Sequence, residues 1–461
     1  MGNVTLAVPD LETDVLRNPA HLVEFSGLTV FAHPSFFSNS ADSRRTLSST
    51  GTPSNSTLDR ETSAETGIDA PIHLFLAAGP ASVGGSFTYQ RDVYKNASEY
   101  DYTTPGSRSY TKDESEFTTP AMIYSVRAAF DFDPVALGME YSANSSDGTL
   151  IARSRWENPD NVTTGEEEYA DRFRGRNGTV GLTFGTPGVS QLSAAGSYGR
   201  GELESKQTRH TINGVPNDLS EPNITKNTSH RTEIIAEWRG SLGAGLAVGL
   251  RADRLTFVQD DLYKGHWSTT TGSSVYQERK QATHDETENE LLAGLSASLG
   301  SRGLVAAEYG YRWLDFETTN YILSSGSGAA GQSVGDIESE TTKKGHRQVL
   351  RLGGEFAVAE WMTLRLGSEV SWSVYVLESK DRINSSVLEH TGNTDATYES
   401  SGGFSVTLPP FRIDYALSYS PVLRYSWVYA PPYEYSFRVI PYTAVQWDAI
   451  FQHHLALRYH I

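Results

Sequence analysis

Charged side chains alternate with apolar ones in the stretch 346–377, which reads HRQVLRLGGEFAVAEWMTLRLGSEVSWSVYVL. Arg351, Glu355, Arg365 and Glu369 fall on one row, and every second residue between them is small or apolar. A period of two places successive side chains on opposite faces of an extended strand. The chemistry of such a row is ion pairing across strands, and the break near residue 360 predicts a hairpin.

The predicted register of this hairpin follows from a turn centred on Glu360, so that directly opposed residues have numbers that add up to 720. Opposite charges then meet on one face, and apolar residues meet on the other, with Phe356 on Leu364 and Val358 on Met362. The same reasoning predicts sums of 267 and 484 for two earlier hairpins. The predicted charge pairs are Glu355 with Arg365, Arg351 with Glu369, Arg127 with Glu140, Glu233 with Arg251, and Arg231 with Asp253.

Catalytic and metal-binding patterns are not found in the sequence: it has no HExxH, P-loop, GxSxG or EF-hand motif. His453, His454 and His460 lie near the C-terminus, but strand parity places His453 on the opposite face from the other two. Acidic runs such as 113–116 and 336–340 are typical of solvated loops. We therefore expect a protein that is not an enzyme and that needs no metal or cofactor.

The composition narrows the class of protein. The chain has 461 residues, no cysteine and a formal net charge of −18, so a nucleic-acid partner is not expected. The sequence contains no run of about 18 apolar residues, so it predicts no membrane-spanning helix. The absence of cysteine excludes disulfides and thiolate chemistry.

Strands in pairs are predicted along the whole chain from residue 26 onward. Tight turns with Gly or Pro are expected near 79–81, 131–136, 186–189, 240–244, 300–303, 359–361 and 408–410. Long segments rich in Ser, Thr, Asn and Asp separate them, roughly at 95–118, 145–167, 209–229, 259–285, 319–345 and 379–396. This layout predicts sixteen strands, with fourteen as the alternative, and places both termini on the short-turn side.

A transmembrane antiparallel up-and-down β-barrel is the fold that this pattern favours, with short periplasmic turns and long extracellular loops. In a soluble sandwich whose core contained the charged row, each unpaired buried charge would cost several kcal/mol. In a barrel the apolar row meets lipid and the charged row lines a wet lumen. A secreted soluble β-protein is the weaker reading.

The first 24 residues differ from the remainder because they lack the alternation. Residues 11–25 predict a short helix that is broken at Pro19. The sequence Asn18-Pro19-Ala20, followed by Leu22, resembles the N-terminal motif of the outer-membrane fatty-acid transporter family, the FadL-type hydrocarbon channels. That family has fourteen strands. The resemblance implies that residues 1–24 form a periplasmic segment or plug of the lumen, and that residues 25–461 form the barrel.

An aromatic stretch at 421–447 has no counterpart elsewhere in the chain. It contains Tyr425, Trp427, Tyr429, Tyr433, Tyr435 and Phe437. We expect an ordered hairpin here that projects on the long-loop side and contacts a ligand or a protein partner.

The expected function is an outer-membrane channel or transporter for a small, possibly hydrophobic, solute in a Gram-negative bacterium. Outer-membrane lipid and lipopolysaccharide are the other expected partners. The alternative is a structural or interaction barrel within a larger cell-surface complex, with its lumen closed.

Overall fold

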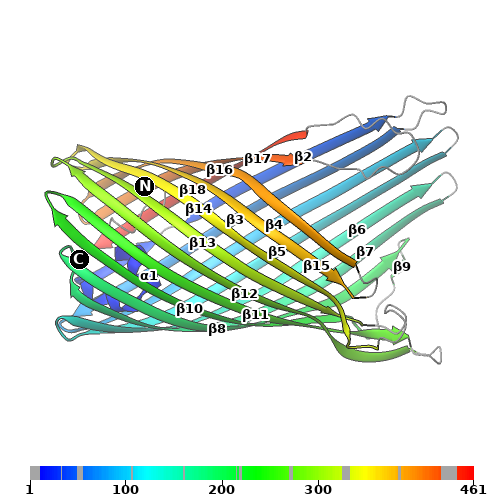
Figure 1. Cartoon of the computed structure of the whole chain (residues 1–461), viewed down its shortest axis with the longest axis horizontal. Helices are drawn as coiled ribbons and strands as arrows, with labels where there is room; N and C mark the ends of the chain where they lie inside the picture. Colours follow the sequence, from blue (N-terminus) through cyan, green and yellow to red (C-terminus); the bar gives the residue numbers. More distant parts are fainter. Residues whose placement is uncertain are drawn as a thin grey trace.

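The structure is a computed structural model. It describes residues 11–32, 34–48, 56–104, 107–158, 161–213, 215–216, 221–268, 274–323, 333–382, 386–426 and 444–460. Two short helices precede a single antiparallel sheet, and almost every described residue after position 26 lies in that sheet (Figure 1).

The elements have the following bounds. The helices are α1 (Leu11–Arg17) and the 3-10 helix η1 (Pro19–Glu24). The strands are β1 (Gly27–Ala32), β2 (Ser35–Ser48), β3 (Ser56–Ala78), β4 (Ala81–Thr104), β5 (Ser107–Asp131), β6 (Val135–Asn158), β7 (Asn161–Thr186), β8 (Ser190–Ile212), β9 (Val215–Pro216), β10 (Ile224–Gly243), β11 (Leu246–Ser268), β12 (Ser274–Leu299), β13 (Gly303–Tyr321), β14 (Ile337–Ala359), β15 (Met362–Asp381), β16 (Ser386–Leu408), β17 (Phe411–Ser426) and β18 (Ala444–His460). The predicted helix and its break at Pro19 therefore agree with α1 and η1.

Strand pairing follows chain order and returns to its start. β3 pairs with β4, and each later long strand pairs with the next. The two-residue β9 pairs with the end of β8, and β8 also pairs with β10. β1 and β2 follow one another in the same register along β3, and both pair with β18 on their other side. Taken together as one wall strand, β1 and β2 bring the described wall to sixteen strands, as predicted (Figure 1).

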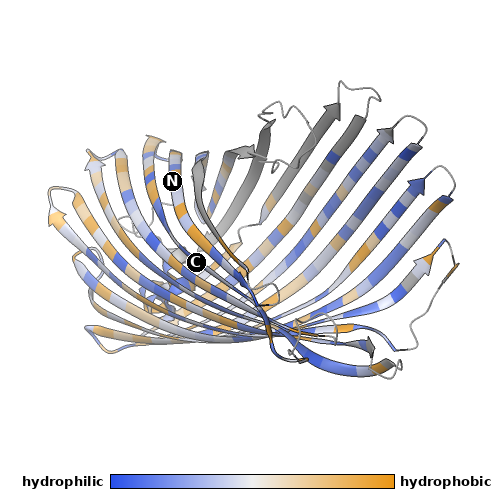
Figure 2. Cartoon of the chain, turned by 45° about the vertical axis from the view of Figure 1, so that its right-hand side comes forward, coloured by the Kyte–Doolittle hydropathy of each residue, from blue (hydrophilic) through white to orange (hydrophobic). Residues whose placement is uncertain are grey.

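The two faces of the wall differ in chemistry near the short turns. Outward apolar side chains are 38–64% exposed there, as for Leu350, Leu352, Phe356, Leu364 and Leu366. Figure 2 shows the apolar residues concentrated in the half that carries these turns, and hydrophilic residues along the other half. Val370 and Trp372, which the alternation placed in the same apolar band, are only half-exposed. Among the described residues, no helix is long and apolar enough to cross a membrane.

The segments predicted as long loops are strands for most of their length, except 319–345, where β13 ends at Tyr321 and β14 begins at Ile337. β4 continues to Thr104 and β5 begins at Ser107, so only two residues separate them where the alternation predicted a loop over 95–118. β7 has 26 residues, whereas about 9–11 suffice to cross the hydrocarbon core. Both faces of these extensions are polar, which removes the hydrophobic alternation, but Thr and Tyr still favour extended backbone and each strand pairs with its neighbours.

Two tight turns depart from their predicted geometry. Gly243, Ala244 and Gly245 all have positive φ, so the β10–β11 turn lies later than the predicted 240–244. The observed register therefore opposes Glu237 to Arg251, which gives a sum of 488 in place of 484. At the β14–β15 turn a bulge pairs Met362 with Ala359 and not with Val358.

Candidate functional site

Residues Leu11–Glu24, called the inner segment below, lie inside the barrel at the short-turn end (Figure 1). Asn18 separates the two helices, and its side chain does three things. Its Oδ1 accepts a hydrogen bond from the Ala20 amide at 3.0 Å, which caps η1. Its Nδ2 donates to the backbone carbonyls of Leu182 at 3.1 Å and Ala194 at 3.2 Å, which are opposed residues of β7 and β8. Asn18 therefore binds the inner segment to the wall.

Two wall glycines allow the inner segment to approach this closely. A Cβ at Gly181 of β7 would overlap the Asn18 side-chain oxygen, and a Cβ at Gly138 of β6 would overlap the backbone of Pro19 and Ala20. The Asn18-Pro19-Ala20 sequence thus lies against a wall surface without side chains.

Ion pairs attach the inner segment to β10. Asp14 accepts two hydrogen bonds from Arg239, at 2.5 and 2.7 Å, and both side chains are largely buried. Arg239 also contacts Glu237 at 2.5 Å. A bidentate arginine–carboxylate pair of this kind fixes orientation as well as distance. At the far end of η1, Glu24 accepts a hydrogen bond from Gln191 of β8 at 2.8 Å.

An apolar cluster lies between the inner segment and the strands near the barrel seam. Val15 and Leu22 of the inner segment are fully buried with Phe31 of β1 and Phe75 of β3. Phe25 packs on Phe75 with ring centroids 4.9 Å apart. The inner segment therefore covers one side of the inner wall by apolar contact and binds β7, β8 and β10 by polar contact.

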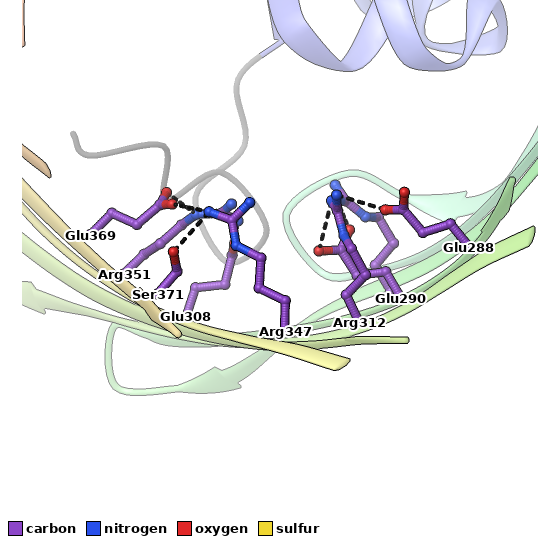
Figure 3. Close-up of polar contacts among 9 residues, drawn as sticks. Glu288, Glu290, Glu308, Arg312, Arg347, Arg351, Glu369 and Ser371 are labelled. Carbon is purple, nitrogen blue, oxygen red and sulfur yellow. Dashed lines mark hydrogen bonds and ion pairs between the residues drawn. The ribbon is translucent and has the colours of Figure 1, made fainter. Parts of the chain in front are cut away.

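The opposite side of the inner wall carries linked ion pairs. Arg351 contacts Glu369 at 2.8 Å and Glu308 at 2.6 Å, which joins β13, β14 and β15. Arg347 lies 3.5 Å from Glu369. Figure 3 shows these side chains projecting from the wall toward the interior. The predicted pairing of Arg351 with Glu369 is the observed register.

A second group lies beside it, around β12 (Figure 3). Arg312 contacts Glu288 at 2.6 Å and Glu290 at 3.2 Å, and Arg251 reaches Glu290 at 3.3 Å. The sequence did not predict Glu288, Glu290 or Arg312 as part of the charged row. Glu290 is the register partner of Arg312 across the tight turn at 300–303, so the rule used for the other hairpins would have found this pair. Arg251 and Glu290 lie on β11 and β12, which the predicted loop over 259–285 separates, so no tight turn related those two.

The third group continues the row to β17. Arg365 contacts Glu355 at 2.7 Å, as the register predicts, and Asp414 at 2.7 Å. Arg412 lies 3.0 Å from Asp414. The pairing of Arg127 with Glu140, at 2.7 Å, also agrees with the predicted register and lies on the side of the inner segment.

The pairs predicted for the β10–β11 hairpin are wrong. Glu233 is opposed to Leu255 and Arg231 to Phe257, while Asp253 is opposed to Ile235. Arg231 and Glu233 contact each other at 3.0 Å along their own strand. The prediction failed because the three residues with positive φ at 243–245 move the turn beyond its expected centre.

The aromatic stretch is largely outside the described residues. Tyr425 lies in β17, paired with Val445, whereas Trp427, Tyr429, Tyr433, Tyr435 and Phe437 fall outside. In the part of the chain that is described, no group of His, Asp and Glu is arranged to hold a metal ion.

No protein-family model and no curated protein matches the chain. The fold of the chain is an antiparallel up-and-down β-barrel. Solved structures similar to it include a FadL homologue from Pseudomonas aeruginosa, with 11% identity, 99% of this chain and 95% of that one covered, and a TM-score of 0.44. The match with the toluene transporter TodX from Pseudomonas putida has 10% identity, covers 100% of this chain and 95% of the TodX chain, and has a TM-score of 0.40. The toluene transporter TbuX from Ralstonia pickettii has 11% identity, with 100% and 98% covered and a TM-score of 0.40.

Proposed function

We propose that the chain is a passive channel of the bacterial outer membrane for a small uncharged solute, and that the inner segment is its plug. The apolar outward band supports insertion in a bilayer. The observation that carries the proposal is the way the inner segment is held: side-chain hydrogen bonds, ion pairs and the packing of Val15 and Leu22 attach it, with no strand pairing. Contacts of this kind can break without opening the wall.

The lining of the inner wall supports the class of solute. Each arginine of the rows on β12–β17 contacts one or two carboxylates, so the charges largely neutralise one another. A lining of this kind offers hydrogen bonds without a strong field of one sign. The apolar cluster around Phe31 and Phe75 lies near one side of the lumen. We therefore infer that the channel takes small uncharged molecules, hydrophobic ones included.

Reconstitution tests the proposal. Purified protein in liposomes should let a neutral pentose enter faster than protein-free liposomes do, and planar bilayers should show stable conductance steps. If neither the native protein nor a variant with a weakened plug gives flux or conductance, the channel proposal fails.

Asn18→Ala should open the channel more often. It removes two hydrogen bonds to wall carbonyls and the cap of η1, each worth about 0.5–1.5 kcal/mol net. The fraction of time spent open should rise by about tenfold or more, measured as single-channel open probability. Leu16→Ala is the matched control, because Leu16 is 37% exposed in the same helix pair. An equal rise in both variants would show that Asn18 has no special role.

Acidification should also release the plug. Burial raises the pKa of Glu24, but the hydrogen bonds of Glu24 with His21 and Gln191 outweigh burial and lower this pKa below 4.5. A lowered pKa stabilises the docked state fully above the ordinary value, and this stabilisation is lost as pH falls through the lowered value. Conductance should therefore rise as the pH is lowered below about 4.5. Glu24→Gln should remove this part of the pH dependence, and an unchanged profile in that variant would contradict the assignment.

A further inference from the structure

Two arginines lie directly opposite each other on the outer face of the wall. Arg176 of β7 is the register partner of Arg200 of β8, and both side chains are exposed. Like charges directly opposed across strands are destabilising. The Arg200 side chain contacts Glu202 at 2.7 Å, whereas the Arg176 side chain has no hydrogen bond or ion pair to any residue that the structure describes. An anion between the two guanidinium groups would remove the repulsion.

The arginine pair lies where the apolar band ends. Outward positions of β7 run from Phe184 through Leu182 and Val180, which are 40–67% exposed, to Gly178 and then Arg176. Arg176 is ten positions before Thr186, the end of the strand at the short turn. About 9–11 residues of a tilted strand cross the hydrocarbon core. With short turns on the periplasmic side, the pair lies at the headgroup level of the outer leaflet.

A surface without side chains lies directly below the pair. Gly178 is opposed to Tyr141 of β6 and to Tyr198 of β8, whose side chains are 50% and 57% exposed. Gly196 is the register partner of Val180. A Cβ at either glycine would meet no atom within 4 Å, so both positions are open.

Tyr198 widens this surface. Its hydroxyl forms a hydrogen bond of 2.9 Å with His230 Nδ1, and the two rings stack with centroids 6.1 Å apart. His230 belongs to β10, on the far side of β8 from Gly178. The ring of Tyr198 is therefore held away from the glycine, and the sheet surface over Gly178 stays open below the arginine pair.

We propose that this surface binds a phosphate-bearing lipid of the outer leaflet, with its phosphate between Arg176 and Arg200 and an acyl chain along Gly178 and Gly196. Guanidinium groups match phosphate oxygens in geometry and charge, and the exposed tyrosine supplies an apolar wall at the membrane boundary. The inference rests on the membrane location in the proposed function but not on solute transport.

The test compares lipid binding by the native barrel, by the double variant Arg176→Gln/Arg200→Gln, and by Arg91→Gln. Arg91 is the matched control: it is exposed on the outer face of β4, ten positions from Ala81, but its neighbours across the sheet are Ile68 and Pro120. The probe is a bisphosphorylated, acylated disaccharide lipid in detergent, measured by native mass spectrometry and by titration. Its enzymatically dephosphorylated form and inorganic phosphate are the two further ligands.

The double variant should bind the phosphorylated lipid about tenfold more weakly or worse, and Arg91→Gln should change binding by less than about twofold. The dephosphorylated lipid should bind the native barrel as weakly as the phosphorylated lipid binds the double variant. Equal binding by the double variant and the native barrel, or by the two lipid forms, would overturn the proposal. Binding of inorganic phosphate as strong as that of the lipid would show an ion site and would also overturn it.

Two controls separate this result from other failures. Heat-dependent gel mobility reports whether each variant is folded, and Arg176→Lys/Arg200→Lys, which keeps both charges, should retain more binding than the double glutamine variant. Solute flux should be unchanged in the double glutamine variant, because the surface faces lipid and not the lumen. Loss of lipid binding with intact flux supports the lipid site alone, whereas absence of flux in every variant bears only on the channel.

Discussion

Leu366→Arg is expected to destabilise the folded barrel by about 2–4 kcal/mol when it refolds into lipid bilayers. Leu366 is 64% exposed on the outer face of β15, beside Leu364 and opposed to Gly354 and Gly402. No acidic residue is opposed to it, so an arginine there would enter the hydrocarbon without a partner. Equilibrium refolding into phosphatidylcholine vesicles across a urea gradient measures the loss.

Glu360→Arg is the matched control for this change. Glu360 is an exposed residue of the β14–β15 turn, beyond the apolar band. The same arginine there should shift the free energy of unfolding by less than about 1 kcal/mol. Equal and small effects of the two substitutions would show that the outward row of β15 does not face lipid.

The wall of the barrel could be predicted from sequence because a few local patterns determine it. The alternation around Leu350 and Leu366 indicates strands and their two faces. The turns at 79–81 and 300–303 contain the glycines Gly79 and Gly300, which have positive φ. Where opposite charges flank a short turn, as for Arg127 with Glu140, the register follows from the turn.

Contacts between residues far apart in sequence could not be predicted. Arg351 contacts Glu308 of β13, but a long connection joins β13 to β14, so no short turn related the two. Asp14 and Arg239 are 225 residues apart. The Asn18-Pro19-Ala20 motif indicated where the inner segment changes direction, but the open surface of Gly138 and Gly181 that receives it became visible only in the folded wall.

The second large effect is expected for Arg351→Met. Arg351 joins two acidic side chains on the inner wall, with Glu308 at 2.6 Å and Glu369 at 2.8 Å. The Glu308 side chain is 2% exposed and that of Glu369 is 14% exposed. Methionine keeps much of the volume but leaves both carboxylates without this partner. Removal of one partner from a buried ion pair costs about 3–5 kcal/mol, which the same refolding assay measures.

Restoring neutrality should recover much of that loss. In Arg351→Met/Glu308→Gln the remaining carboxylate, Glu369, keeps Arg347 at 3.5 Å, and replacement of a buried ion pair by neutral residues is often close to neutral in free energy. The double variant should therefore be more stable than Arg351→Met alone, although it carries one more substitution. Leu352→Ala, on the outward face of the same strand, is the control for general damage to β14, and Glu308→Gln should not rescue it. If the double variant is less stable than the single one, Arg351 acts through packing and not through its charge, and the inner row is then not held together by ion pairs.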